Sequence, residues 1–131
     1  MAVVLAELRV RDLVVTNSMG ASGTVVLPNG NQAAEIGTFG AGATTPSVIS
    51  GIVYQTNNGG LTTTISDFAD GVPGQEITVI FKDNFTTIDF TSSSLYGNGG
   101  IDWAPSGNDH MQCVADGTNW WCSCFVNTSR A

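Results

Sequence analysis

Charged side chains are scarce in this chain of 131 residues. Asp, Glu, Lys and Arg together make up 11% of the sequence, whereas roughly 25% is usual for soluble domains. Acidic residues outnumber basic ones, and the formal net charge is −7. An acidic surface repels phosphate backbones and anionic lipids, so we expect binding to neither nucleic acid nor membranes. The low charge content also predicts that much of the surface lies against other chains.

Long apolar runs and targeting signals are missing as well. No run approaches the roughly 20 apolar residues needed to cross a bilayer. The opening residues, MAVVLA, lack a basic segment, and Glu7 and Arg9 follow them closely, which does not fit a secretory signal. We therefore expect the chain to fold in the cytoplasm.

The motifs of common enzyme classes are also missing. The sequence has no glycine-rich nucleotide fingerprint, no P-loop and no Ser-His-Asp arrangement. Asp67 with Asp70, or Asp102 with Asp109, could pair as the two carboxylates of a glycosidase. Each of them lies in or near a turn, however, where Asp is favoured for its hydrogen bonds to the local backbone. We expect no enzymatic activity, no cofactor and no metal.

What the sequence does contain is glycine, threonine and short apolar runs. The run EITVIF alternates and places Ile77, Val79 and Phe81 on one face, as in a half-buried strand. Turn signals such as 57–60, Asn-Asn-Gly-Gly, recur between such runs. This spacing predicts an all-β fold, an antiparallel β-sandwich or β-prism. We assign it to residues 29–131 as a β-rich knob, which begins with a glycine-rich connector over residues 29–51.

Residues 1–28 form a second, thinner region. Two apolar pieces, LVV and TVVL, flank the turn SMGASG, and an isolated hairpin of this kind is marginally stable at best. We therefore expect an N-terminal arm that buries its apolar side chains against other chains, as a docking segment or trimer stem. The expected contact residues are Leu8, Val10, Leu13, Val15, Val25 and Leu27.

The stretch DGTNWWCSCF, residues 116–125, predicts the closing hairpin of the knob. Asp-Gly between two strand-like runs is a strong signal for a two-residue turn with positive φ. Such a turn sets Cys113 opposite Trp120. We expect Gly117, Trp120 and Cys122 to form the centre of this hairpin.

The cysteines of this hairpin allow three interpretations. His110, Cys113, Cys122 and Cys124 have the chemistry of a tetrahedral zinc site, but His110 and Cys113 point to opposite faces of a regular strand. A disulfide between Cys113 and Cys122 is geometrically feasible as a diagonal pair. We favour free thiols, buried as small hydrophobic groups beside the indole rings.

The aromatic residues raise the alternative of carbohydrate binding. Adjacent side chains of a strand point to opposite faces, so one of Trp120 and Trp121 belongs to the core and the other to an outer or subunit contact. The residues that could stack on sugar rings are Tyr54, Tyr96, Trp103, Trp120 and Trp121. Of these, Tyr96 and Trp103 are the candidates we select.

The later part of the chain resembles a known family. The segments TTTISDFADGVPGQEITVIF, TTIDF and DGTNWW…SR are similar to the terminal β-domain of bacteriophage tail fibres and tailspikes, over about residues 52–130. The matching positions are Thr64, Ile65, Phe68, Gly74, Gln75, Asp116, Gly117, Thr118, Trp120, Ser129 and Arg130. The arm also resembles the intertwined β-stems of such fibres.

This resemblance implies a parallel homotrimer on the surface of a phage particle, made in the host cytoplasm. The expected function is that of a non-enzymatic virion protein, either a capsid decoration (cement) protein or a short fibre. Its partners would be its own copies and either the major capsid protein or a tail or baseplate protein. The alternative is a module that recognises a host receptor by binding a cell-surface glycan.

Overall fold

The computed structural model describes residues 36–127. The chain divides into two units, Met1–Gln32 and Ala33–Ala131, and all described residues belong to the second. The expected arm, residues 1–28, lies outside the described residues together with its contact residues Leu8, Val10, Leu13, Val15, Val25 and Leu27.

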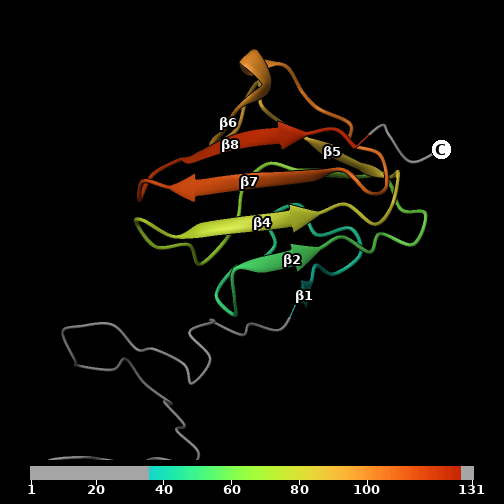
Figure 1. Cartoon of the computed structure of the whole chain (residues 1–131), viewed down its shortest axis with the longest axis horizontal. Helices are drawn as coiled ribbons and strands as arrows, with labels where there is room; N and C mark the ends of the chain where they lie inside the picture. Colours follow the sequence, from blue (N-terminus) through green and yellow to red (C-terminus); the bar gives the residue numbers. More distant parts are fainter. Residues whose placement is uncertain (1–35, 128–131) are drawn as a thin grey trace, which may run out of the picture. The chain divides into compact units, whose positions relative to one another are not determined.

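Eight short strands and one 3₁₀ turn make up the described domain (Figure 1). They are β1 (Gly37–Thr38), β2 (Val53–Gln55), β3 (Thr63–Ile65), β4 (Glu76–Ile80), β5 (Thr86–Ile88), β6 (Leu95–Tyr96), the turn η1 (Asn98–Gly100), β7 (His110–Ala115) and β8 (Trp120–Phe125). Six strands form one sheet in the order β1-β2-β4-β7-β8-β6, and β3 pairs with β5 in a second sheet. The expected all-β fold is confirmed.

The expected antiparallel arrangement is right for two strand pairs and wrong for the others. β4–β7 and β7–β8 are antiparallel, whereas β1–β2, β2–β4, β3–β5 and β6–β8 are parallel. Parallel neighbours need a crossover connection of a dozen or more residues. For β2–β4 and β3–β5 the crossover includes a strand of the other sheet, since β2, β3, β4 and β5 alternate between the two sheets. The turn at 57–60 therefore leads the chain across to the second sheet and does not reverse it within the first.

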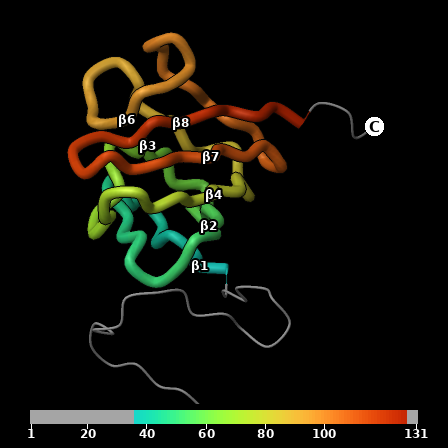
Figure 2. Tube along the Cα trace, turned by 60° about the vertical axis from the view of Figure 1, so that its left-hand side comes forward, coloured from blue at the N-terminus to red at the C-terminus, as the bar shows by residue number. Residues whose placement is uncertain are grey.

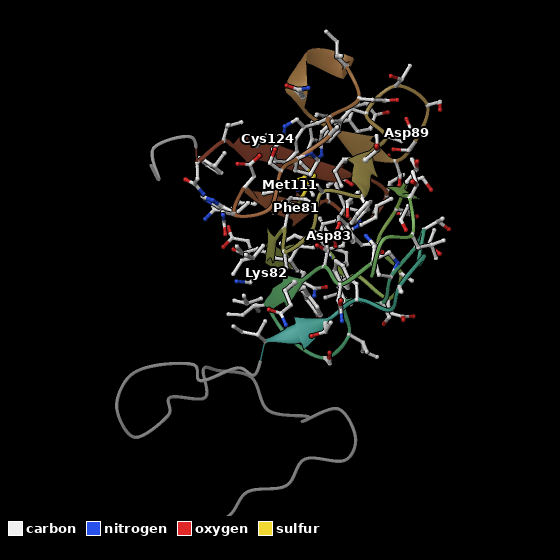
Figure 3. The ribbon with its side chains drawn as sticks, turned by 90° about the vertical axis from the view of Figure 1, so that its right-hand side faces the viewer. Phe81, Lys82, Asp83, Asp89, Met111 and Cys124 are labelled. Carbon is white, nitrogen blue, oxygen red and sulfur yellow. A yellow bond between two sulfur atoms is a disulfide. The ribbon has the colours of Figure 1, made fainter. Side chains whose placement is uncertain are left out.

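The hydrophobic core lies on the inner face of the six-stranded sheet. Alternation along β4 buries Ile77 and Val79, as the sequence predicts, and Phe81 follows them into the core. Ile65 of β3 and Ile88 of β5 belong to the same buried cluster, so the small sheet covers part of this inner face. Figure 2 shows β3 behind β7 and β8. Phe81 and Met111 lie in the interior in Figure 3.

The segment expected to be a connector, residues 29–51, takes part in the fold over its described portion. β1 adds an edge strand to the sheet, and Phe39 stacks on Tyr54 with the ring centroids 5.0 Å apart. Val48 is fully buried, and its N–H donates to the carbonyl of Ala69. Phe39 and Val48 are the buried residues of this segment. The glycine-rich composition around them gave no sign that they join the core.

A repeated tripeptide forms the second sheet. Residues 63–65 and 86–88 both read Thr-Thr-Ile, and they pair in register, Thr63 with Thr86 and Ile65 with Ile88. The side chains of the first and third positions face inward and are buried. A shift by one residue would turn the buried side chains of one strand outward, and a polar partner of the paired threonines distinguishes the observed register further.

The buried amide of Asn58 supplies this distinction. Its Oδ1 accepts hydrogen bonds from the Thr63 hydroxyl and from the N–H of Gly42, both at 3.1 Å. Its Nδ2 donates to the Thr86 hydroxyl at 2.7 Å, and its backbone N–H donates to Asp83 Oδ2 at 3.1 Å. One side chain therefore bridges both strands of the small sheet and the loop that follows β1.

Replacing Asn58 should damage the fold much more than replacing its neighbour. Asn58→Ala leaves buried hydroxyls and a backbone N–H without this partner, and each such group costs about 1–3 kcal/mol. We expect a loss of about 2 kcal/mol or more in the free energy of unfolding, measured by urea denaturation. Asn57 is exposed, so Asn57→Ala should change the stability by less than about 0.5 kcal/mol. Equal losses in the two variants would contradict the bridging role.

Candidate functional site

The β7–β8 hairpin is present, but its turn is wider than the sequence predicts. Ala115 pairs with Trp120, so the loop consists of residues 116–119 instead of Asp116 and Gly117 alone. Asp116 causes the difference because its Oδ1 accepts from the N–H groups of Thr118 and Asn119, at 2.8 and 2.7 Å. Gly117 has the expected positive φ, 101°.

The wider turn shifts the pairing of the two strands by two residues. Because side chains alternate with period two, an even shift leaves each residue on its predicted face. Trp120 is accordingly buried in the core and Trp121 is exposed. Cys113, however, now lies opposite Cys122 and not opposite Trp120.

This register joins Cys113 and Cys122 in a disulfide. Their Cα atoms are 4.1 Å apart, close to the shorter of the two spacings in an antiparallel ladder. The prediction of free thiols was wrong for this pair, because it depended on the two-residue turn. Cys124 is the free cysteine of the described residues, and burial raises the pKa of its thiol to about 11.

The zinc interpretation loses its ligands in this arrangement. Cys113 and Cys122 are bonded to each other, and within residues 36–127 no three His, Cys, Asp or Glu side chains are grouped as metal ligands. His110 stacks on Phe125 with the ring centroids 4.6 Å apart. Its Nδ1 lies 3.3 Å from Nδ2 of Asn127.

The four aspartates considered as catalytic pairs accept hydrogen bonds from loop residues. Asp102 Oδ1 accepts from the N–H groups of Phe90 and Thr91, at 3.0 and 3.1 Å. The buried Asp109 accepts from the N–H groups of Ser106 and Asn127, both at 2.9 Å. Asp67 accepts from the N–H that follows it, and Asp70 accepts from a serine hydroxyl. These carboxylates shape turns, as the sequence predicts.

Hydrogen bonds to three of the acids lower their pKa values. The N–H of Ser92 and its hydroxyl lower the pKa of Asp89. The N–H of Asn119 and the indole of Trp121 lower that of Asp116. For Asp83, burial raises the pKa, but hydrogen bonds from Phe85, Asn58 and others outweigh burial, and the net shift is downward.

The outward face of the six-stranded sheet carries little charge. Strand register arranges its side chains in three rows across the sheet, of which only Glu76 is acidic and none is lysine or arginine. The rows are Thr38, Gln55, Ile80, His110 and Phe125; Val53, Thr78, Gln112 and Ser123; and Glu76, Val114, Trp121 and Tyr96. The face therefore offers mainly hydroxyl, amide and apolar side chains, in keeping with the 11% of charged residues in the whole chain.

An exposed aromatic pair stands at one end of this face. Tyr96 and Trp121 stack with their ring centroids 4.9 Å apart and an interplanar angle of 22°. Trp103, which the sequence analysis pairs with Tyr96, packs against the core, edge-on to Phe81 at 5.3 Å. Trp121 is among the aromatic residues considered from the sequence but is not one of the two selected. Alternation separates Trp120 from Trp121, and the structure shows that Trp121 is the outward one.

Comparison with known proteins gives no relative. No protein family matches the chain, and neither a curated protein nor a solved structure does. The resemblance to tail-fibre domains therefore stays a prediction. Within residues 36–127 we find no helix with the length and apolar character that crossing a membrane requires.

The disulfide can be checked by counting thiols. Unfolded without reductant, the protein should react with one equivalent of a thiol reagent, at Cys124, and after reduction with three. Removing a cross-link of this loop length costs about 2.5 kcal/mol. The double variant Cys113→Ser/Cys122→Ser should therefore show a lower melting temperature. Cys124→Ser should change it much less, and three reactive thiols before reduction would contradict the assignment.

Acid should destabilise the domain through Asp83. Its folded-state pKa is lowered, so its contribution to stability is present above the unfolded pKa, about 3.9, and is lost as the pH falls through the folded value. The variant Asp83→Asn should be less stable than the parent at pH 7. Its stability should also fall less between pH 5 and pH 2, as measured by urea denaturation. An equal fall in both proteins would rule out this role of Asp83.

Proposed function

We propose that the chain is a non-enzymatic virion protein of a bacteriophage, a homotrimeric capsid decoration protein or short fibre. In this proposal residues 1–28 dock the trimer to the particle, through the major capsid protein or a tail or baseplate protein. The described domain would be a β-sandwich or β-prism knob at the virion surface. The sequence resemblance given above is one support for this proposal.

The main structural support is exposed aliphatic surface in the first described residues of the domain. Ile36, directly before β1, is 54% exposed, and Ile49, in the connection from β1 to β2, is 77% exposed. Among the strands of residues 36–127, β1 is an edge strand of two residues that pairs on one side only, with β2, and open edges of this kind accept further strands. Exposed isoleucines before and after an edge strand fit a subunit that is completed by its neighbours.

The disulfide also fits a location on a particle. Disulfides persist on virion and cell surfaces but are rare in the reducing cytoplasm. A protein made in a host cytoplasm would form the Cys113–Cys122 bond after the particle leaves the cell. The knob would therefore be more stable on the released particle than during its synthesis.

The assembly proposal predicts a specific effect at Ile49. The parent protein should have the mass of a trimer by light scattering. Ile49→Glu should shift the protein towards smaller species. Each subunit contact should weaken about tenfold or more in its association constant, because burial of an isoleucine contributes about 1.5–3 kcal/mol.

Ile101 provides the matched control. It is 68% exposed, lies beside η1, and its change to Glu adds the same charge. Ile101→Glu should leave the trimer intact. A monomeric parent that keeps its folded circular-dichroism spectrum would overturn the proposal, and equal effects of the two variants would overturn the role of Ile49.

Recognition of a host glycan is the second candidate function. The observation that favours it is the stacked and exposed pair Tyr96–Trp121. A trimer could carry three such sites, and a virion protein can have both functions.

A further inference from the structure

The aromatic pair lies between two hollows of the sheet face. One hollow, of about 360 Å³, is lined by Thr78, Gln112, Glu76, Val114, Trp121 and Ser123 among others. The second, of about 490 Å³, is lined by Tyr96, residues 97–100, Val114, Trp121 and Ser123 among others. Both volumes fall within the range of sites for small ligands. Trp121 borders both hollows and Tyr96 borders the second. Because the two rings cover one face of each other, a ligand with several rings can stack on the remaining face of each.

Trp121 is held in place on two sides. Its indole N–H donates to Asp116 Oδ2 at 2.9 Å, and Tyr96 stacks on its ring. Asp116 in turn is held by two backbone N–H groups of its loop. An aromatic side chain whose position is fixed before binding loses little conformational entropy when a ligand binds. Trp121 is 51% exposed and Tyr96 is 47% exposed, so both rings are accessible to a ligand while their orientation is fixed by these contacts.

The chemistry around the pair selects among ligands. The hollows offer hydroxyl and amide groups from Thr78, Gln112 and Ser123 and the backbone of η1. Such groups bind hydroxyls, and aromatic faces bind the apolar C–H faces of sugar rings. The nearby ionised groups, Glu76 in the first hollow and Asp116 on the indole, are both acidic, so they repel anionic ligands.

We propose that the face around Trp121 and Tyr96 binds a neutral oligosaccharide, with these two rings stacking on its sugars. This inference deepens the second candidate function and requires nothing of the assembly. The predicted ligands are chains of hexoses or N-acetylhexosamines. Sialylated, uronic-acid, sulfated and phosphorylated glycans are predicted not to bind.

A glycan array with the full chain tests the ligand class. Neutral oligosaccharides should be retained at low and at physiological salt, and the anionic glycans on the same array should not. The best neutral binder is then titrated in solution while tryptophan fluorescence is followed. Binding of anionic glycans alone, or of no glycan, would overturn the inference.

Variants test the location of the site. Tyr96→Ala should weaken binding of that oligosaccharide about tenfold or more. The variant loses the apolar contact between the tyrosine ring and a sugar ring, and a contact of this size corresponds to about a tenfold change in affinity. Trp121→Ala should do the same, but it also removes the bond to Asp116. Tyr96→Ala is therefore the decisive variant, and circular dichroism confirms that it is folded.

Phe125→Ala is the matched control. Phe125 is also exposed on the outward face of β8 and also stacks on a neighbouring ring, that of His110, but it lines neither hollow. Its removal should leave the affinity unchanged. Equal losses in Tyr96→Ala and Phe125→Ala, or none in Tyr96→Ala, would refute the site. A trimer that binds no glycan refutes only this inference, and a monomer that binds a neutral glycan refutes only the assembly.

Discussion

The two-sheet arrangement depends on the hydrogen bonds of one buried side chain, that of Asn58. A chain that alternates between two sheets has no tight hairpins to fix its register over β2 to β5. The small sheet joins two identical tripeptides, in which burial of Ile65 and Ile88 already opposes a shift by one residue. Asn58 binds Thr63 on one strand and Thr86 on the other. Because an unpaired buried polar group is costly, a slipped register that breaks these bonds is strongly disfavoured.

Carboxylates have a similar role in the loops, and this explains the unusual charge balance. Asp83, Asp89, Asp102, Asp109 and Asp116 each accept at least two hydrogen bonds from backbone N–H groups. A carboxylate that satisfies backbone donors needs no lysine or arginine as a partner. The acids therefore accumulate in the turns without matching bases, and the outward face of the sheet is left almost free of charge.

Sequence patterns predicted which side chains of a strand face the core, but they predicted less well which strands pair with each other. Alternation placed Ile77 and Val79 on one buried face and set Trp120 and Trp121 on opposite faces, because it depends only on the local period of a strand. Pairing depends on the turns. The side chain of Asp116 widened the last turn by two residues, which turned an expected diagonal pair of cysteines into a directly bonded one. The turn at 57–60 was recognised, but no local signal says whether a turn reverses a strand or carries it to another sheet.

The stacking site shows the same limit. Tyr96 was predicted from its residue type, but its stacking partner depended on the pairing of β6 with β8. In that pairing Tyr96 lies opposite Trp121, 25 residues later in the chain (121 − 96). Only this parallel pairing sets Tyr96 beside Trp121. Trp103 is equally aromatic, yet its bridge to Ile88 turns it towards Phe81 and the core.

The order of strands allows the two proposed surfaces to act together. β1, next to Ile36, is the first strand of the six-stranded sheet, and β8, which carries Trp121, is the fifth. With neighbouring strands about 4.8 Å apart, four steps separate them by roughly 19 Å. A neighbouring subunit that adds to the open edge at β1 therefore need not cover the aromatic pair near the opposite edge. Assembly at one edge and glycan binding near the other are physically compatible on one small domain, and neither surface requires residues of the other.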